Sequence, residues 1–143
     1  PTWGVGSERL MMAADSARRA GALERAEKYR NWAGKFIAQH ESDGTDPGQQ
    51  FMAMVAAYDG RDDEAVKHLV AAIEKQDAWQ TLLNRPLLAT FATRKEVKAA
   101  TARRLAALDV QRAEVLRMLC GPQPVSSQYR PAPATCREFR PAD

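Results

Sequence analysis

Two stretches of the chain, 39 residues apart, carry the same pattern of small residues. Residues 10–33 read LMMAADSARRAGALERAEKYRNWA, and residues 49–72 read QQFMAMVAAYDGRDDEAVKHLVAA. When Gly21 is aligned with Gly60, four alanines of each stretch coincide: Ala14 with Ala53, Ala17 with Ala56, Ala26 with Ala65, and Ala33 with Ala72. Two helices that cross closely need small residues, and a Gly between them permits a tight turn. The pattern therefore predicts two antiparallel helical hairpins that repeat along the chain.

The composition favours an all-α fold. Hydrophobic residues make up 45% of the 143 residues but aromatic residues only 7%, and the apolar residues are mostly the helix formers Ala, Leu, Val and Met. This length suits a single domain with one modest core. No apolar run approaches the roughly 18 residues of a membrane span, and no signal-peptide pattern opens the sequence. We therefore expect no membrane insertion.

Apolar spacing places four amphipathic helices over residues 7–19, 23–40, 46–59 and 62–75. A polar loop over residues 41–45 separates the two pairs. Asp46, Pro47 and Gln49 have the spacing of a capping box at the start of the third helix. A second capping box, Thr93 with Glu96, is expected to open the longest helix, over residues 94–119.

These elements predict one helical domain over residues 1–119 and a Pro-rich tail over residues 120–143. The domain comprises repeats at about 7–40 and 46–75, a degenerate third repeat at 77–92, and a capping helix at 94–119. In the third, Asp77 with Gln80 is expected to start a short helix that Pro86 interrupts. Leu87, Leu88 and Phe91 are expected to form an apolar cluster. Five of the eight prolines follow residue 120, which predicts an extended tail. The chain begins with Pro1, and we expect a segment of a longer protein rather than a processed mature form.

The aligned positions resemble the tetratricopeptide repeat (TPR) family. The family's inter-helix Gly falls on Gly21 and Gly60, and five extra residues relative to its period of about 34 fit the loop at 41–45. Its characteristic first-helix Tyr is replaced by Ala17 and Ala56. The decayed third repeat resembles the C-terminal TPR regions of proteobacterial multidomain regulators and adenylate cyclases. The family's small residues match Ala14 and Ala53 in the first helices, and Ala26, Ala33, Ala65 and Ala72 in the second.

The resemblance implies a protein-interaction or scaffolding module, as the C-terminal part of a larger bacterial sensory or regulatory protein. In the family, the first helix of each pair lines a groove that binds a protein or peptide segment. Methionine adapts to irregular apolar partners, tyrosine offers a flat contact, and arginine can bind a carboxylate with two hydrogen bonds. The alternative is that the methionines pack against the next helix and the arginines are only solvated. The matching positions are Met11, Asp15, Arg18, Arg19, Gln50, Met54 and Tyr58.

The charge is unevenly distributed. The net charge is +3, but residues 41–80 hold nine acidic and three basic side chains between two basic ends. A nucleic-acid site would more often be one continuous basic stripe, so we expect nucleic acid not to be the partner. The basic helix at 94–119 could cap the stack or pair with a second copy. Because its apolar spacing is not a clean heptad, a cap is favoured. The residues that would pair are Leu105, Leu108, Leu116 and Leu119.

Cys120 and Cys136 are the only cysteines, and a bond between them would close a short loop around the tail. A disulfide would stabilise a segment that cannot build its own core. We predict the disulfide, and with it a periplasmic or other extracytoplasmic setting. The alternative is two reduced thiols in a cytoplasmic protein.

The sequence contains no recognisable catalytic pattern. His40 and His68 have no nucleophile or carboxylate at a known catalytic spacing, and no Gly-rich phosphate loop is present. The two histidines also lie far from the cysteines, so no zinc site is expected. We predict a protein that is not an enzyme and that needs no metal or cofactor. A structural or dimerisation appendage of an enzyme elsewhere in the parent chain, or a nucleic-acid-binding accessory module, are the alternatives.

Overall fold

A computed structural model describes residues 4–75, 79–121 and 133–138 of the chain, and every regular element in these ranges is a helix. This confirms the all-α class for the described residues. The chain forms two compact units, Pro1–Thr101 and Ala102–Asp143, which are described separately below. The elements are α1 (Gly4–Arg19), α2 (Leu23–Ser42), α3 (Gln49–Tyr58), α4 (Asp62–Lys75), η1 (Trp79–Thr81), α5 (Pro86–Ala89), η2 (Thr90–Thr93), α6 (Lys95–Leu119) and α7 (Pro133–Glu138).

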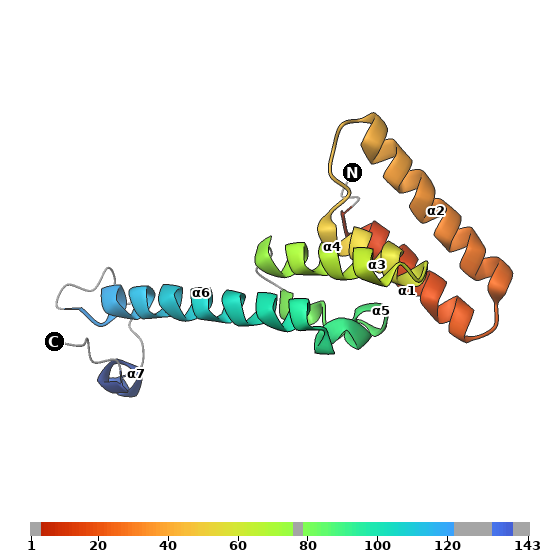
Figure 1. Cartoon of the computed structure of the whole chain (residues 1–143). Helices are drawn as coiled ribbons and strands as arrows, with labels where there is room; N and C mark the ends of the chain where they lie inside the picture. The colour runs from red at the N-terminus through yellow and green to blue at the C-terminus, as the bar shows by residue number, and fades with distance from the viewer. Residues whose placement is uncertain (1–3, 76–78, 122–132, 139–143) are drawn as a thin grey trace. The chain divides into compact units, whose positions relative to one another are not determined.

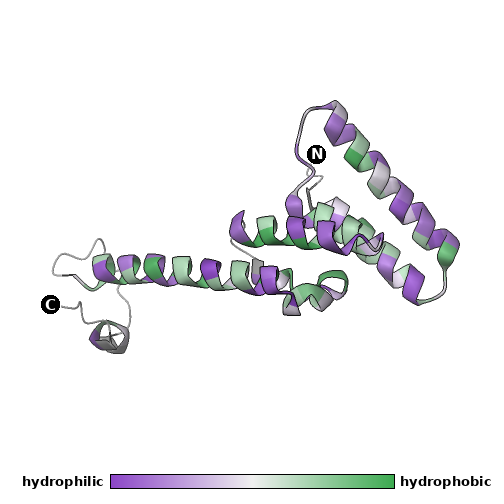
Figure 2. Ribbon diagram, in the orientation of Figure 1, coloured by the Kyte–Doolittle hydropathy of each residue, from purple (hydrophilic) through white to green (hydrophobic). Residues whose placement is uncertain are grey.

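The first unit is built on two pairs of consecutive helices. Helix α1 packs against α2, and α3 packs against α4, while α1 also contacts α3 and α3 contacts α5 (Figure 1). A short turn joins the two helices of each pair. Helix α2 has only two buried residues, Ala26 and Ala33, and most of it is coloured hydrophilic in Figure 2. By contrast, six of the ten residues of α3 are buried, so α3 is the central helix of this unit.

The turn after α1 and the turn after α3 have the same backbone geometry. Gly21 has a φ of 76° and Gly60 a φ of 73°, a left-handed conformation that costs other residues about 1–2 kcal/mol. The amide of Ala22 donates to the carbonyl of Ala17 at 2.9 Å, and the amide of Arg61 donates to the carbonyl of Ala56 at the same distance. Such bonds satisfy the last carbonyls of a helix. The predicted glycine turns are confirmed at both positions.

The core of the first unit combines the aligned alanines with a few large apolar side chains. All eight aligned alanines are buried, and none is more than 8% exposed. Large apolar side chains fill the space between these alanines. Examples, each 2% exposed or less, are Phe51, Leu69, Ile73 and Leu88. Leu87 and Phe91 are buried as well, which confirms the predicted apolar cluster.

The predicted capping box at Asp46 is wrong. Gly48 has a φ of 96°, which is not helical, so α3 begins at Gln49 instead of Pro47. The carboxylate of Asp46 accepts a hydrogen bond from the amide of Gly48 at 2.8 Å, which forms a turn two residues before the helix. The side chain of Gln49 is also used elsewhere, because its Oε1 lies 2.7 Å from Nδ1 of His68.

The second capping box is wrong for a related reason. Arg94 is extended, with φ −66° and ψ 139°, so it is the residue that precedes α6. Thr93 is the last residue of η2 and stands one position too early to cap α6. The short helix that Pro86 was expected to interrupt ends earlier, because η1 stops at Thr81, and Pro86 is the first residue of α5. Proline suits this position, where its missing amide proton is not needed. The predicted start at Asp77 lies outside the described residues.

In the second unit, a disulfide joins Cys120, next to the end of α6, to Cys136 in α7. The S–S distance is 2.09 Å and the Cα atoms are 5.5 Å apart. The predicted disulfide is therefore confirmed. The predicted extended tail is wrong at Pro133–Glu138, which form α7, because Pro133 again occupies the first helical position. Residues 122–132 and 139–143 of the predicted tail lie outside the described residues, and the proposed domain boundary at 119/120 stays a prediction.

Candidate ligand pocket between α1, α3 and α5

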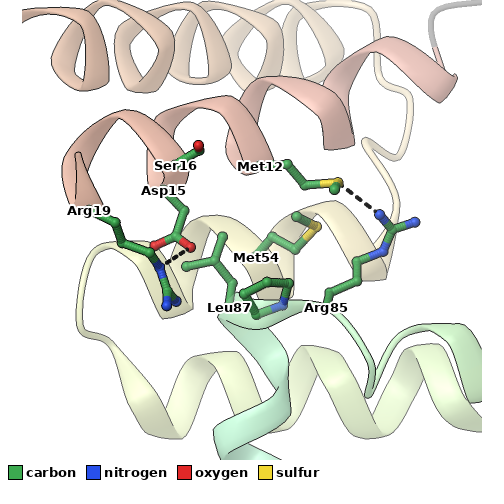
Figure 3. Close-up of a pocket in the computed structure, with 8 residues that line it drawn as sticks. Met12, Asp15, Ser16, Arg19, Met54, Arg85 and Leu87 are labelled. Atoms are coloured by element: carbon green, nitrogen blue, oxygen red, sulfur yellow. Dashed lines mark hydrogen bonds and ion pairs between the residues drawn. The ribbon is translucent and has the colours of Figure 1, made fainter. Parts of the chain in front are cut away.

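The first unit contains a pocket of about 270 Å³ between α1, α3 and the start of α5. Figure 3 shows Asp15 and Arg19 on one side of it, and Met12 and Arg85 on the other. It is thus built from segments far apart in the sequence, and all of them belong to one compact unit. The lining residues are Met12, Asp15, Ser16, Arg19, Met54, Arg85, Pro86 and Leu87.

Apolar side chains form much of the pocket wall. Met54 is fully buried in α3, and Leu87 of α5 is 8% exposed. Both belong to the hydrophobic core, so their positions are held by packing. Met12 of α1 is 42% exposed, at the opening of the pocket. The pocket can therefore hold an apolar group against a rigid surface.

Asp15 is a buried carboxylate whose charge is balanced by two arginines. Its side chain is 8% exposed, and it accepts hydrogen bonds from Arg19 Nε at 2.8 Å and from Arg18 Nη2 at 3.4 Å. A buried carboxylate without such partners would be strongly destabilising. The two terminal nitrogens of Arg19 donate to no side chain within the described residues. Since the Arg19 side chain is 62% exposed, these nitrogens can bind an acceptor on a ligand.

Arg85 is the second cation of the pocket, and its hydrogen bonding is incomplete. Its Nη2 donates to Glu8 at 2.7 Å, and its Nη1 to the sulfur of Met12 at 3.0 Å, which is a weak acceptor. Its Nε is buried and has no acceptor among the described residues. Sequence reasoning missed Arg85 and Met12 as pocket residues. The only available signal was the position of Arg85 directly before the apolar cluster of Leu87 and Leu88.

Of the seven predicted groove residues, Asp15, Arg19 and Met54 line the pocket together. Arg18 and Tyr58 lie beside it: the guanidinium of Arg18 stands 3.8 Å from the centre of the Tyr58 ring, and its Nη1 donates to the Tyr58 carbonyl at 2.8 Å. These contacts connect α1 to the end of α3.

The other two predicted residues face away from solvent. Met11 is fully buried in the core, and Gln50 is only 9% exposed. Met11 therefore packs in the core, as the alternative interpretation of the methionines predicted. Met54 is also packed in the core, but it lines the pocket as well. Binding of a partner by any of the seven residues stays a prediction.

A partly buried ion pair lies outside the pocket, between α2 and the turn after α3. Arg30 Nε and Nη2 donate to the two oxygens of Asp59, and Arg61 donates to the same carboxylate at 3.2 Å. The hydrogen bonds from Arg30 hold the pKa of Asp59 below its usual value, against the opposing effect of burial. The same bonds raise the pKa of Arg30. The pair is thus charged at all ordinary pH values and contributes to the fold rather than to proton transfer.

The described residues include another pocket, lined by Leu10, Trp32 and Phe36 among others, but no metal site. Among the described residues, no group of three or more His, Cys, Asp or Glu side chains is arranged to hold a metal ion. His68 bonds to Gln49 and lies 3.7 Å from Glu64, and His40 lies 2.6 Å from the hydroxyl of Thr45. None of the described helices is long and apolar enough to cross a membrane.

The geometry defines an all-helical protein, in its described part, with a two-arginine pocket that has an apolar wall. Comparison with known proteins adds no relative, since no family model, no curated protein and no solved structure matches this chain.

Proposed function

We propose that the first unit is a TPR-like protein-interaction module, and that the pocket binds a segment of another protein. The segment would place an apolar side chain against Met54 and Leu87, and a carboxylate beside Arg19 and Arg85. The mechanism is binding alone, without catalysis and without a cofactor. The observation that carries the proposal is the pairing of a core-supported apolar wall with two arginine donor groups: the exposed terminal nitrogens of Arg19, and Nη1 of Arg85, which contacts only the weak acceptor sulfur of Met12.

The helical hairpins support the repeat interpretation. The Gly21 and Gly60 turns share similar φ angles and the same hydrogen-bond pattern, and the four pairs of aligned alanines, 39 positions apart, are all buried. The pocket lies on α1, α3 and α5, which are the first helices of the two pairs and the first helix after them. In a stack of helical pairs, these helices line one common face. A segment lying on that face would contact all three.

Charge favours an acidic partner over a basic one. At the pocket, Arg18, Arg19 and Arg85 stand against the carboxylates of Asp15 and Glu8, which leaves one more positive than negative charge. A carboxylate can take two parallel hydrogen bonds from one guanidinium, and such bonds are about twice as strong as neutral ones. A volume of about 270 Å³ suits one apolar side chain and an adjacent charged group.

A peptide series tests this proposal. We expect synthetic 12-residue peptides with one Leu or Met beside a Glu or Asp to shift the NMR signals of Asp15, Arg19 and Leu87. Arg19→Glu should weaken the tightest peptide at least about tenfold, because it replaces a charge-assisted bond with repulsion. Arg19 also neutralises the buried carboxylate of Asp15, so this variant should melt at a lower temperature, and its binding is compared well below its unfolding transition.

Arg25→Glu is the matched control, because Arg25 lies exposed on α2, outside the pocket, and the change in net charge is the same. Equal weakening by both variants would indicate a general charge effect and would count against the pocket. Peptides that bind without shifting any pocket signal would also refute the site.

We further propose that the module serves as the C-terminal part of a larger bacterial sensory or regulatory protein, as the resemblance to TPR regions implies. The disulfide between Cys120 and Cys136 supports an extracytoplasmic setting, because disulfides persist in oxidising compartments. The capping role of α6 is part of the same proposal. Labelling Cys120 and Cys136 in intact cells with a membrane-impermeant thiol reagent, before and after a reductant that also stays outside, would test the compartment.

A further inference from the structure

Met12 is much more exposed than Met11, its neighbour in the sequence, and than Met54, the other methionine of the pocket. Met11 and Met54 are fully buried, whereas Met12 is 42% exposed at the opening of the pocket. Met118 is similarly exposed, at 47%, but lies in the second unit. Methionine oxidation follows access of the oxidant to the sulfur. Met12 is therefore the methionine in the pocket that an oxidant can reach.

The sulfur of Met12 also contacts Arg85, which is paired with Glu8 through Nη2 but has only this sulfur as the acceptor for Nη1. Arg85 Nη1 lies 3.0 Å from the sulfur, and Arg85 Nε is buried without a partner among the described residues (Figure 3). A thioether is a weak acceptor, so this contact contributes little. A sulfoxide carries a polar oxygen on the same sulfur, and an oxygen is a much better acceptor for a guanidinium.

We propose that Met12 is an oxidation site, at which hydrogen peroxide converts the thioether to a sulfoxide that binds Arg85 across the pocket opening. The peroxide O–O bond breaks and one oxygen forms a bond to the Met12 sulfur, which loses two electrons. The other oxygen leaves as water with both protons. The reaction needs no other reagent, and a sulfoxide can be reduced again by dithiol-dependent reductases.

Oxidation changes the pocket in two ways. It occupies Nη1 of Arg85, the terminal nitrogen that is not bonded to Glu8, and it places a polar oxygen beside the apolar wall of Met54 and Leu87. Both changes disfavour an apolar, acidic segment. This effect on binding rests on the proposed function, whereas the oxidation and the new contact with Arg85 do not.

The first experiment measures which methionines react. The full chain, folded, is treated with hydrogen peroxide, and tryptic peptides are quantified over time by tandem mass spectrometry, in which fragment ions assign the oxidised residue because Met11 and Met12 share one peptide. We expect Met12 and Met118 to oxidise together, and Met11 and Met54 to lag by about tenfold or more, because burial limits access. If Met12 reacts no faster than its buried neighbour Met11, the oxidation site is refuted.

The second experiment measures the contact with Arg85 by hydrogen exchange, in a background that carries both Met52→Leu and Met118→Leu, because Met52 is only partly buried. Oxidation should slow exchange in the segment 82–89 about tenfold, the factor that one charge-assisted hydrogen bond typically contributes. The variant Met12→Gln, whose amide oxygen mimics the sulfoxide, should slow it without peroxide. Met12→Leu, which cannot be oxidised this way, should show no change on treatment.

Unchanged or faster exchange in oxidised protein would refute the contact, even if Met12 is oxidised. The loss of peptide binding on oxidation is scored separately. If none of the synthetic peptides binds, the proposed function is refuted. The oxidation rates and the exchange of residues 82–89 still test the oxidation of Met12 and its contact with Arg85. If peptides bind equally well before and after Met12 is oxidised, the gating role is refuted.

Discussion

Arg30 of α2 holds the carboxylate of Asp59 with two parallel hydrogen bonds, 2.7 Å long from Nε and 2.6 Å long from Nη2. Asp59 directly follows α3, and Arg18 of α1 binds the carbonyl of the preceding residue, Tyr58. Each helix of the first pair thus contributes one arginine to the end of α3. Both side chains of the Arg30–Asp59 pair are about one-quarter exposed, so the pair is only partly screened by water. We conclude that these arginines help fix the second helical pair on the first.

A double-mutant cycle on this pair should show clear coupling. Arg30→Ala and Asp59→Ala should each lower the free energy of unfolding, by about 1–2 kcal/mol, because each removes two charge-assisted hydrogen bonds between partly buried side chains. The coupling energy should be about 1 kcal/mol, and urea denaturation of the four proteins measures it. Glu114 and Arg117 on α6 form an exposed pair that serves as the control, with no measurable coupling expected. Additive effects at Arg30 and Asp59 would show that their bonds do not support the fold.

The stability contributed by Asp59 should depend on pH in a defined direction. Its folded pKa lies below its usual value, so between the folded and unfolded pKa the unfolded chain binds more protons. The contribution is therefore fully present above the unfolded pKa of about 4 and is lost as the pH falls through the lower, folded pKa. We expect the stability difference between wild type and Asp59→Asn to shrink as the pH falls from about 4.5 towards 2.

The same comparison at neutral pH provides the reference, because Asn cannot titrate. The raised pKa of Arg30 does not make the free energy of unfolding depend on pH in this range, since arginine loses its proton only far above neutral pH. A difference in stability that stays constant from neutral pH down to about 2 would contradict the assignment of the low pKa to this ion pair.

Enlarging an aligned alanine should destabilise the first unit. Ala53 is fully buried at the packed face of α3, and Ala53→Leu should lower the free energy of unfolding by about 1–3 kcal/mol, because the extra carbon atoms must displace neighbours. Ala106→Leu is the matched control, since Ala106 is exposed on α6 and should tolerate the same change. Thermal unfolding measures both. If Ala53→Leu melts at the wild-type temperature, close packing does not explain the small residue there.

Reducing the disulfide should loosen α7. The folded protein should contain no reactive thiol before reduction and two afterwards, as titration with a thiol reagent under denaturing conditions will count. Closing a loop of this size contributes on the order of 3 kcal/mol by constraining the unfolded chain. Amide exchange at residues 133–138 should therefore rise steeply on reduction. The variant Cys120→Ser with Cys136→Ser should behave like the reduced protein and should not respond to the reductant. Unchanged exchange on reduction would mean that α7 is held by other contacts.

The sequence predicted the local elements well because their signals are local. The bounds of α4 agree with the prediction at both ends, and the glycine turns fall where they were expected. Helix starts were less reliable: the predicted caps at Asp46 and Thr93 both fail, by two residues and by one residue respectively. A capping box needs a backbone conformation as well as a residue spacing. The φ of Gly48 and the extended Arg94, which the spacing does not reveal, decided both cases.

The candidate site was only partly predictable. Asp15, Arg19 and Met54 were named from positions in the repeat, but the other cation of the pocket was not. Arg85 lies 73 residues from Met12 in the sequence, and it reaches the pocket only because α5 packs against α3. Helix α5 has four residues, which is too short for apolar periodicity to indicate its face.

Met11 and Met12 show which features the sequence determined and which features the tertiary structure decided. Periodicity and glycine conformation are properties of a few neighbouring residues, so the helices, their turns and the small crossing residues could be predicted from the sequence. Two adjacent methionines on one helix point about 100° apart, and the face that becomes core depends on where the other helices lie. Packing buried Met11 and left Met12 beside Arg85. The same long-range packing brought Arg30 to Asp59, because a contact between distant residues depends on how the helices assemble.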